Sequence, residues 1–561
     1  KISGSLEKYS GKLYIDTLDF KVKLTQEGPH LSLQYETDEG VYRINALKEK
    51  QTLVGTGVNP KGQTFDWSAQ LIEAFEELDE VEEDTPHVHH YGETWFPNMA
   101  YGWQQQPTQD NIIFRNATVW TNEDVGTIDQ ADVAISQGKI VKVGVGIVAE
   151  EIFKKESFQE IDAKDMHLTS GIIDEHSHIA ISRGVNEGSQ ASSAEVSIAN
   201  VINSDDINIY RQLSGGVTTA QLLHGSANPI GGQSGIIKFR WGSSPDKMKF
   251  EGADGFIKFA LGENVKQSNW GDYERIRFPQ TRMGVEQVFY DHFMRARAYE
   301  KEWQNYNALS LSEKRRTQAP REDLEMNTLV EILNSERFIT CHSYVQSEIN
   351  MLMHVADSMG FTLNTFTHIL EGYKVADKMK EHGAGASTFS DWWAYKFEVN
   401  DAIPHNASIL ADMGIVTAIN SDDAEMARRL NQEAAKAVKY GGVSQEEAWK
   451  MVTLNPAKLL HLDHRVGSIK SGKDADIVLW TDNPLSVYAK VQQTYVDGRC
   501  YFDAEKDLEL RQRNTQERAR LIQKMLSDKK AGKPTQVVKA EQRIHYHCDT
   551  LEDGKHDNHQ H

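Results

Sequence analysis

The sequence predicts an α/β protein built around a (β/α)8 barrel, with a smaller β-sandwich domain assembled from both flanks of the barrel. Two observations support this fold class. Short apolar runs alternate with helix-like segments between residues 168 and 460, as in strand–helix units. Strand-rich segments lie on either side, at 111–167 and 461–503. Because short apolar runs do not distinguish a barrel from an open sheet, a doubly wound sheet is the competing arrangement.

We expect an extra antiparallel β module at residues 1–72, ahead of the barrel and its flanks. Short runs such as 20–24 and 31–35 alternate apolar and polar residues in part, and Gly and Asp interrupt them. This pattern is typical of strands joined by turns. Residues 73–110 then form a linker that is acidic at first and aromatic later.

The barrel region, residues 168–460, contains eight apolar runs that we expect to be its strands. They are 171–174, 217–223, 236–240, 256–261, 338–341, 363–367, 384–388 and 415–420. The segment at about 265–337 is too long for an ordinary barrel connection, so we expect a helical insertion there that caps the site. After the β domain, residues 504–561 begin as a charged helix and continue as a polar, His-rich tail.

Composition excludes some classes of function. Lys and Arg number 61 against 82 Asp and Glu, a net charge of −21, which argues against a nucleic-acid partner because phosphates need a positive face. No apolar run approaches the roughly 18 residues that span a bilayer. Because the chain begins with Lys1, we expect a processed periplasmic or secreted protein whose precursor carried an upstream segment. A trimmed cytoplasmic protein would look the same.

Metal-ligand residue types end four of the predicted strands. His176 and His178 end the first strand, His342 the fifth, His368 the sixth and Asp422 the eighth. Side chains two apart in a strand point to the same side, so both imidazoles of the His-x-His pair can reach one point. Active sites of barrels lie at the carboxyl ends of their strands. The joint pattern therefore predicts a metal site.

These residues, in this order, resemble the amidohydrolase superfamily. The resemblance covers about residues 111–503, and it is nearest to imidazolonepropionase-like members through 215–219, 260–264 and the stretch from 455 to 476. It implies metal-assisted hydrolysis at a carbon centre. The implied cofactor is a divalent metal, Zn²⁺ in the first place, with one or two ions per chain.

The fourth strand decides the number of metals that the resemblance implies. Members with two metals carry a bridging ligand there, either a carboxylated lysine or a glutamate. We expect Glu263 to be this ligand because it lies beyond the apolar run, at the mouth of the strand. Lys258 lies within the run and is the alternative strand-four ligand.

Two ligand arrangements stay open. The two-metal arrangement uses His176, His178, Glu263, His342, His368 and Asp422. In the one-metal arrangement His368 orients the substrate, and the ligands are His176, His178, His342 and Asp422.

Catalytic and substrate-binding roles are predicted from the chemistry and position of individual residues. Asp422 can take a proton from the attacking water and pass it to the leaving nitrogen, with His368 beside it. Four further residues are predicted to contact the substrate: His224, Gln233, Tyr344 and Arg282. The aromatic residues Trp392, Trp393 and Tyr395, which follow the seventh strand, either wall the pocket or form an aromatic core cluster.

The predicted function is a metal-dependent hydrolase that cleaves an amide-type C–N bond of a small molecule. The alternatives within enzymes are an Xaa-Pro-type dipeptidase, a deaminase, or a lactone or ester hydrolase. The alternative outside enzymes is a degenerate barrel that acts as a binding module. The retained Asp422 argues against this last reading, since binding alone does not need it. Whether the chain forms a homo-oligomer stays open.

Overall fold

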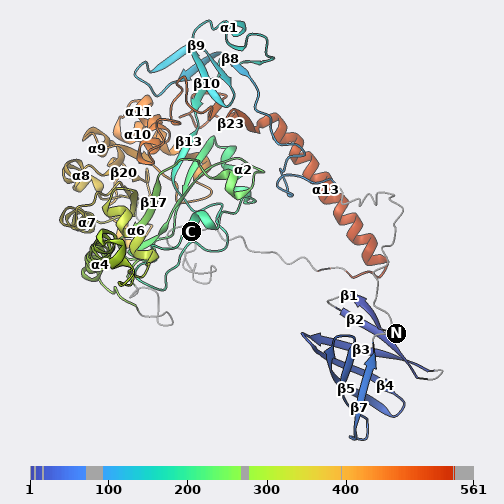
Figure 1. Cartoon of the computed structure of the whole chain (residues 1–561). Coiled ribbons are helices and arrows are strands. Elements are labelled where there is room, and N and C mark those ends of the chain that lie inside the picture. Colours follow the sequence, from blue (N-terminus) through green and yellow to red (C-terminus); the bar gives the residue numbers. More distant parts are fainter. Residues whose placement is uncertain are drawn as a thin grey trace. The chain divides into compact units, whose positions relative to one another are not determined.

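A computed structural model describes residues 2–5, 8–15, 18–70, 93–266, 277–392, 395–534 and 536. The chain divides into two compact units, Lys1–Gly92 and Glu93–His561 (Figure 1). No helix within these described segments has the length and apolar character needed to cross a bilayer. The His-rich tail predicted after the last helix lies outside the described residues.

The first unit is a seven-stranded antiparallel sheet whose strands pair in chain order. The strands are β1 (Ile2–Ser5), β2 (Lys8–Ile15), β3 (Leu18–Glu27), β4 (His30–Thr37), β5 (Gly40–Glu49), β6 (Thr52–Val58) and β7 (Thr64–Gln70). Alternate residues of β4 are buried, and Val22, Leu33 and Ile44 pack together on that face. The expected antiparallel β module is confirmed, with more strands than the sequence indicated.

A β domain in the second unit is built from both flanks of the barrel. Its sheet has the order β10-β9-β8-β12-β22-β23-β24, and β11 pairs with β8. The strands are β8 (Ile112–Trp120), β9 (Thr127–Ser136), β10 (Lys139–Gly144), β11 (Gln159–Asp162), β12 (His167–Ser170), β22 (Ile477–Trp480), β23 (Val491–Val496) and β24 (Arg499–Asp503). β12 and β22 join the flanks in an antiparallel pair, with Leu168 opposite Leu479.

Strands are present at all eight positions predicted for the barrel. They form a sheet of order β13-β14-β16 and a sheet of order β15-β17-β18-β19-β20-β21. The strands are β13 (Ile172–Ser177), β14 (Val217–Leu222), β15 (Ile230–Gln233), β16 (Gly235–Lys238), β17 (Gly255–Ala260), β18 (Arg337–His342), β19 (Thr365–Thr367), β20 (Gly385–Thr388) and β21 (Thr417–Ile419). The two sheets meet at two places. One is Ser234, which lies between β15 and β16, and the other is the hydrogen bond from the Asp422 N–H to the His176 carbonyl, over 3.1 Å.

The third predicted strand does not run parallel to its neighbours. β16 is antiparallel to β14, with Leu222 opposite Gly235, and β15 is antiparallel to β17. A parallel crossover needs about a dozen residues or more, usually including a helix. Residues 223–234 separate β14 from its partner β16, and they contain the strand β15 in place of a crossover helix. The chain therefore returns antiparallel at this place, unlike the regular strand–helix alternation expected of a (β/α)8 barrel.

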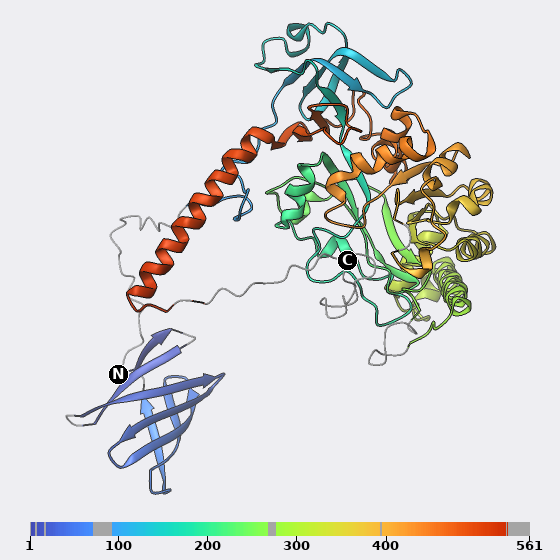
Figure 2. The same ribbon diagram turned by 180° about the vertical axis from the view of Figure 1, so that it is seen from behind.

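Helices cover the outside of these strands (Figure 1 and Figure 2). The longer ones are α2 (Ile207–Leu213), α4 (Arg282–Ala308), α6 (Leu324–Leu333), α7 (Gln346–Met359), α8 (Ala376–His382), α9 (Asn406–Asp412) and α10 (Leu430–Gly441). The shorter ones are α3 (Pro245–Met248), α5 (Leu311–Lys314), α11 (Gln445–Lys450) and α12 (Leu454–Leu459). The short helix α1 (Ala149–Phe153) packs instead against β9 of the β domain. The 3₁₀ turns are η1 (Ile198–Asn200), η3 (Gly372–Lys374), η4 (Phe397–Val399) and η5 (Ala427–Arg429).

The predicted insertion belongs to this outer layer. α4 packs against α6 and α7, and its Phe289 and Phe293 contact Phe259 and Phe361 at ring distances of 5.4 and 4.2 Å. The apolar face of α4 is therefore buried on the outside of the barrel, so this helix of the insertion does not cap the site. Residues 267–276, ahead of the helix, lie outside the described residues.

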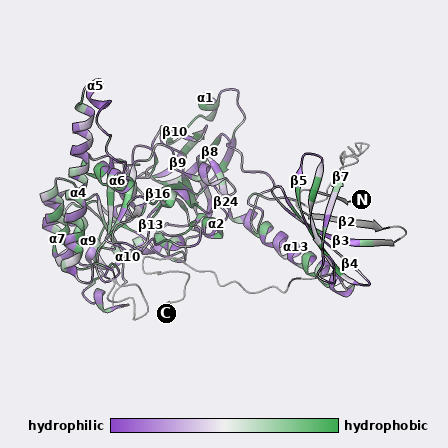
Figure 3. Ribbon diagram, turned by 60° about the horizontal axis from the view of Figure 1, so that its bottom comes forward, coloured by the Kyte–Doolittle hydropathy of each residue, from purple (hydrophilic) through white to green (hydrophobic). Residues whose placement is uncertain are grey.

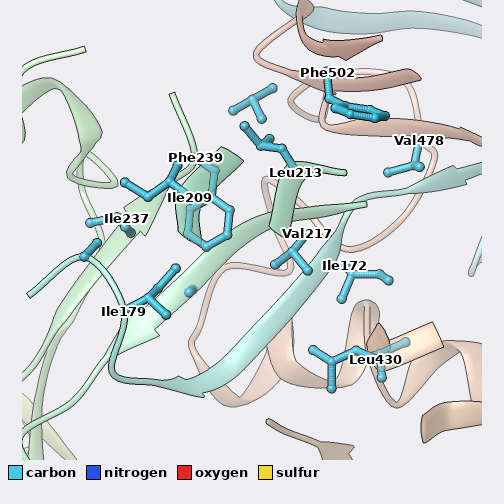
Figure 4. Packing of buried hydrophobic residues seen from close by; sticks show 14 of the residues in the cluster. Ile172, Ile179, Ile209, Leu213, Val217, Ile237, Phe239, Leu430, Val478 and Phe502 are labelled. Atoms are coloured by element: carbon cyan, nitrogen blue, oxygen red, sulfur yellow. The ribbon is translucent and has the colours of Figure 1, made fainter. Parts of the chain in front are cut away.

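An apolar cluster joins the barrel to the β domain (Figure 4). Ile172 and Val217 of the barrel strands pack with Val478 and Phe502 of the β domain. After β24, the helix α13 (Ala504–Lys530) begins where Asp503 accepts hydrogen bonds from two backbone N–H groups. This is the charged helix that the sequence predicts, and hydrophilic and hydrophobic residues are mixed along it (Figure 3).

Candidate metal centre

Five of the predicted ligands lie together at the carboxyl ends of the barrel strands. His176 Nε2 and His178 Nε2 are 3.2 Å apart, and Asp422 Oδ1 lies 3.5 and 3.1 Å from them. Asp422 Oδ2 lies 3.5 Å from His368 Nε2. The rings of His342 and His368 are 5.3 Å apart, so His342 completes the cluster.

Two of these residues adopt a backbone conformation that L-residues rarely use. His368 has φ 57° and Asp422 has φ 50°. Both follow short strands, β19 and β21, and each residue turns the chain sharply at the end of its strand. Left-handed backbone at residues other than Gly is costly and concentrates at functional sites, where it aims a side chain.

Hydrogen bonds at Nδ1 orient the first two histidines. His178 Nδ1 lies 2.8 Å from the Leu223 carbonyl, which can only accept, so His178 carries its proton there. His176 Nδ1 lies 3.0 Å from the hydroxyl of Thr367, and that hydroxyl donates to Glu175 Oε2 over 3.1 Å. A hydroxyl has one proton to donate, so it must accept from His176. Both Nε2 atoms therefore present lone pairs toward each other.

This donor set fits a divalent metal. Two nitrogen lone pairs 3.2 Å apart repel each other unless a cation lies between them. Two Zn–N bonds of about 2.0–2.1 Å at a tetrahedral angle place their nitrogens about 3.3 Å apart. The three separations among His176, His178 and Asp422, 3.2, 3.5 and 3.1 Å, lie around that value. Ligand atoms of His176, His368 and Asp422 also lie within 4.8 Å of one another.

His342 gives a second, independent sign of a cation site. Its side chain is fully buried, and within the described part of the chain neither ring nitrogen has a hydrogen-bond partner. A buried polar group without a partner costs free energy, so such groups are rare outside functional sites. A metal bound through one of these nitrogens would remove that cost.

The electrostatics keep the imidazoles neutral, as metal ligation requires. Burial, followed by the positive charge of Lys258, lowers the pKa of His176 well below its usual value. Burial and the neighbouring His368 do the same to the pKa of His342. The pKa of His178 is lowered mainly by burial, against the opposing pull of Asp422.

The fourth strand places Lys258, and not Glu263, beside the histidines. Lys258 is fully buried, and its Nζ lies 3.1 Å from His176 Nε2. Strand alternation explains this, because Phe259 points outward to α4 and Lys258 must then point inward. Glu263 lies beyond β17, where Arg282 and Lys266 hold its carboxylate at 2.7 and 2.9 Å. This geometry favours Lys258 over Glu263, and the identity of the fourth-strand ligand stays a prediction.

Three of the predicted substrate-binding residues are engaged elsewhere. His224 Nε2 accepts from the Glu187 N–H over 2.7 Å, and its Nδ1 lies 2.9 Å from the Gly225 carbonyl. Gln233 donates to the Ala194 carbonyl and to Thr328. These contacts fix loops around β14 and β15.

Arg282 lies among three carboxylates. It contacts Glu263 at 2.7 Å, Glu348 at 3.1 Å and Glu398 at 3.3 Å. The guanidinium thus balances the charge of these glutamates, and this structure gives it no role as a clamp for a substrate carboxylate.

Aromatic side chains form one side of the histidine cluster. Tyr344 is buried, and its ring lies 4.5 Å from that of His342. Phe389 stacks on His368 at 4.5 Å, and Trp392 stacks on Phe389 at 4.8 Å. Tyr395 contacts Trp392 in turn, at 5.9 Å. These contacts fit both predicted alternatives, the aromatic wall and the aromatic core cluster, because Tyr344 and Phe389 are buried in one apolar cluster against which Trp392 packs. Trp393 lies outside the described residues.

Sequence reasoning missed the residues that support the ligands. Thr367 and Glu175 orient His176 through the hydroxyl described above. Asp174 accepts from both the backbone N–H and the hydroxyl of Ser421, at 3.1 and 2.5 Å, and so fixes the turn that precedes Asp422. A threonine next to a predicted ligand is a weak signal by itself. Asp174 and Glu175 are a stronger indication of supporting residues, because two carboxylates inside an apolar strand need buried partners.

Residues 168–501, more than half of the chain, match the model of the Amidohydrolase family. Among curated proteins, amidohydrolase tasK of Hapsidospora irregularis is 30% identical over 430 residues, which are 70% of this chain and 43% of that protein. An imidazolonepropionase of Thermoplasma volcanium is 27% identical over 172 residues, 29% of this chain and 42% of the relative. The chain thus spans less than half the length of these curated relatives.

A solved structure matches a similar share of the chain. The crystal structure of an amidohydrolase from Thermotoga maritima MSB8 is 30% identical, covers 70% of this chain and 100% of its own, and superposes with a TM-score of 0.62. This similarity implies that the two barrel sheets form one TIM-like barrel beside a β-sandwich.

Proposed function

The chain belongs to the amidohydrolase family, and we propose that it is a metal-dependent hydrolase that cleaves an amide-type C–N bond of a small molecule. The observation that carries this proposal is the set of near-tetrahedral separations among His176, His178 and Asp422, combined with the orphaned nitrogens of His342. A divalent metal bound there, Zn²⁺ in our proposal, lowers the pKa of a water to about 7 and polarises a scissile carbonyl.

Asp422 is the proposed general base. The leaving nitrogen of an amide must gain a proton as the C–N bond breaks, and the carboxyl group that took the proton of the water can supply it. Asp422 therefore moves one proton twice. In the one-metal arrangement, where His368 is no ligand, its Nε2 lies 3.5 Å from Asp422 Oδ2 and can share this proton.

Lys258 is the proposed fourth-strand ligand, in a carboxylated form. The neutral Nζ would add to CO₂, forming an N–C bond and releasing one proton, and the resulting carbamate would offer two oxygens. Its position 3.1 Å from His176 Nε2 supports this, since a group added at Nζ would stand among the histidines. His342 and His368 would then hold a second metal. An unmodified Lys258 corresponds to the one-metal arrangement.

The aromatic wall bears on the substrate. Phe389 and Trp392 extend from His368 as stacked rings, so a substrate with a flat or apolar group beside the scissile bond would find a matching surface. One relative is named an imidazolonepropionase, which makes cyclic amides the first compounds to test.

The test combines a substrate screen with one substitution. Purified chain, reconstituted with Zn²⁺, is assayed against cyclic amides, N-acyl amino acids, dipeptides, aminopurines and lactones. We expect hydrolysis of an amide, lost in Asp422→Asn while metal binding persists. Turnover of lactones or release of ammonia instead would replace the amide assignment by an esterase or a deaminase. Full activity of Asp422→Asn would refute the proposed base.

A further inference from the structure

A cavity of about 350 Å³ lies on the outer helical layer, against α4 and the start of α6. Its volume is at the lower end of the range for small-molecule sites. It is lined by Tyr299, Glu300, Trp303, Glu322, Asn327 and Val330. None of these residues belongs to the metal centre, and it is the earlier part of α4 that packs on the barrel, through Phe289 and Phe293.

Two aromatic rings, held in place, form one side of this cavity. Tyr299 and Trp303 lie one helical turn apart on α4, with ring centroids 6.4 Å apart and planes at 78°. The Tyr299 hydroxyl donates to Asn327 Oδ1 over 2.7 Å and accepts from the Asp323 N–H over 3.2 Å. Trp303 Nε1 is buried and has no hydrogen-bond partner among the described residues.

Two carboxylates flank the rings without a cation to balance them. Glu300 accepts from Asn334 Nδ2 over 3.1 Å, and Glu322 from Asn327 Nδ2 over 3.4 Å. Neither carboxylate forms an ion pair with another of the described residues. The α4 cavity, as we call it, therefore combines uncompensated negative charge with edge-to-face aromatic rings.

We propose that the α4 cavity binds an alkylated ammonium ion of the choline type. Aromatic faces attract cations through their quadrupole, and quaternary ammonium groups are recognised in this way. A quaternary nitrogen donates no hydrogen bond, so it needs only the charge of the two carboxylates and the faces of the rings.

The full chain is titrated with choline and with its neutral isostere 3,3-dimethylbutan-1-ol, using calorimetry. We expect saturable binding of choline and binding of the isostere about tenfold weaker or worse, because only the charge differs. Trp303→Leu and Glu322→Gln should each weaken choline binding by about five- to tenfold, and Trp303→Phe less. Glu302→Gln, an exposed residue on the same helix, is the matched control and should bind as the unchanged chain does.

Equal affinity for choline and the isostere would refute the proposal and reduce the site to an apolar groove. Absence of choline binding, or choline binding that Trp303→Phe and Trp303→Leu both leave unchanged, would also overturn it. Circular dichroism melting of each variant establishes that the chain is folded.

A second inference concerns Thr367 and rests on the proposed metal-dependent function. The Thr367 hydroxyl makes three hydrogen bonds. It donates to Glu175 Oε2, and it accepts from Asn420 Nδ2 over 3.3 Å and from His176 Nδ1 over 3.0 Å. All of these residues are fully buried. With its proton used on Glu175, the hydroxyl can only stabilise the His176 tautomer that is protonated at Nδ1.

We infer that Thr367 is a positioning residue that keeps the lone pair of His176 on Nε2, directed to the metal site. Partners of this kind typically contribute 10- to 100-fold in metal affinity. Thr367→Val removes the hydroxyl at constant shape, and Thr367→Ser restores it. Thr340→Val is the matched control, because Thr340 is equally buried on the adjacent strand and its hydroxyl contacts Gln221 instead.

The readout is Zn²⁺ affinity, measured by competition with a chromophoric chelator. We expect Thr367→Val to bind Zn²⁺ at least tenfold more weakly, with Thr367→Ser and Thr340→Val within threefold of the unchanged chain. Equal affinity of Thr367→Val would overturn the inference alone. If the unchanged chain bound no Zn²⁺, the proposed function itself would fail.

Discussion

Lys238 should be one of the most costly side chains to remove outside the metal centre. It lies on β16, fully buried, and its Nζ is 2.7, 3.0 and 2.6 Å from Asp474, Asp476 and Asp497. The three aspartates belong to the segments before β22 and after β23. One ammonium group therefore joins the barrel to the β domain.

The expected cost follows from what remains after Lys238→Met. Asp497 keeps Arg240 at 2.6 Å and Asp474 keeps Arg465 at 2.8 Å. Asp476 forms no other ion pair in the described part of the chain. Breaking a buried pair costs about 3–5 kcal/mol, and the surviving cations favour the lower figure, about 3 kcal/mol.

The assay is scanning calorimetry of the full chain. An unfolding entropy of about 2.1 cal/mol/K per residue gives roughly 1 kcal/mol/K for a unit the size of residues 93–561. A loss of about 3 kcal/mol in the free energy of unfolding therefore lowers Tm by about 3 °C. Adding Asp476→Asn to Lys238→Met should recover more than half of this loss. Lys249→Met, which breaks an exposed pair with Asp246, should change Tm by less than about 0.5 °C. No loss in Lys238→Met, or no recovery in the double variant, would refute the reasoning.

Three further predictions concern the metal centre and acid stability. Asp422→Asn should lower kcat by about 10²- to 10⁴-fold in a turnover assay, and equal kcat would contradict its role. Lys258→Met should reduce the metal content in the presence of bicarbonate, while Glu263→Gln should not; the reverse would restore Glu263 as the ligand. Burial raises the pKa of Asp474, but Lys238, Lys139 and Arg465 together lower it to about 2. Since this pKa is below the usual 3.8, ionised Asp474 stabilises the folded chain fully above about pH 4, and this stabilisation is lost as pH falls toward 2. The check is Tm measured against pH, which should decline more steeply in the unchanged chain than in Asp474→Asn.

The fold could be predicted from the sequence where a residue pattern is compatible with a single kind of structure. Apolar runs located all eight barrel strands, and the flanking strands indicated one β domain. The direction of β16 could not be predicted, because a short run such as 236–240 is equally apolar in a parallel strand and in a hairpin. The information lies in the connection, residues 223–234, which holds a strand and no helix.

The metal site could be predicted in part for a similar reason. His176, His178, His368 and Asp422 follow strands directly, so their place at the strand ends was fixed once the strands were known. Lys258 is harder to identify as a ligand from the sequence, because it lies inside an apolar run, where core residues are expected. Alternation with Phe259, which faces α4, points Lys258 inward.

The metal content of the full chain most directly tests the central claim. The chain is stripped with chelator, reconstituted with Zn²⁺ and bicarbonate, freed of excess ion and measured by mass spectrometry against protein concentration. We predict two ions per chain, falling to one in Lys258→Met. The ligand atoms of His176, His178 and Asp422 already lie at the separations that one bound ion requires. A reconstituted chain that is folded and holds no metal would therefore contradict the proposed hydrolase.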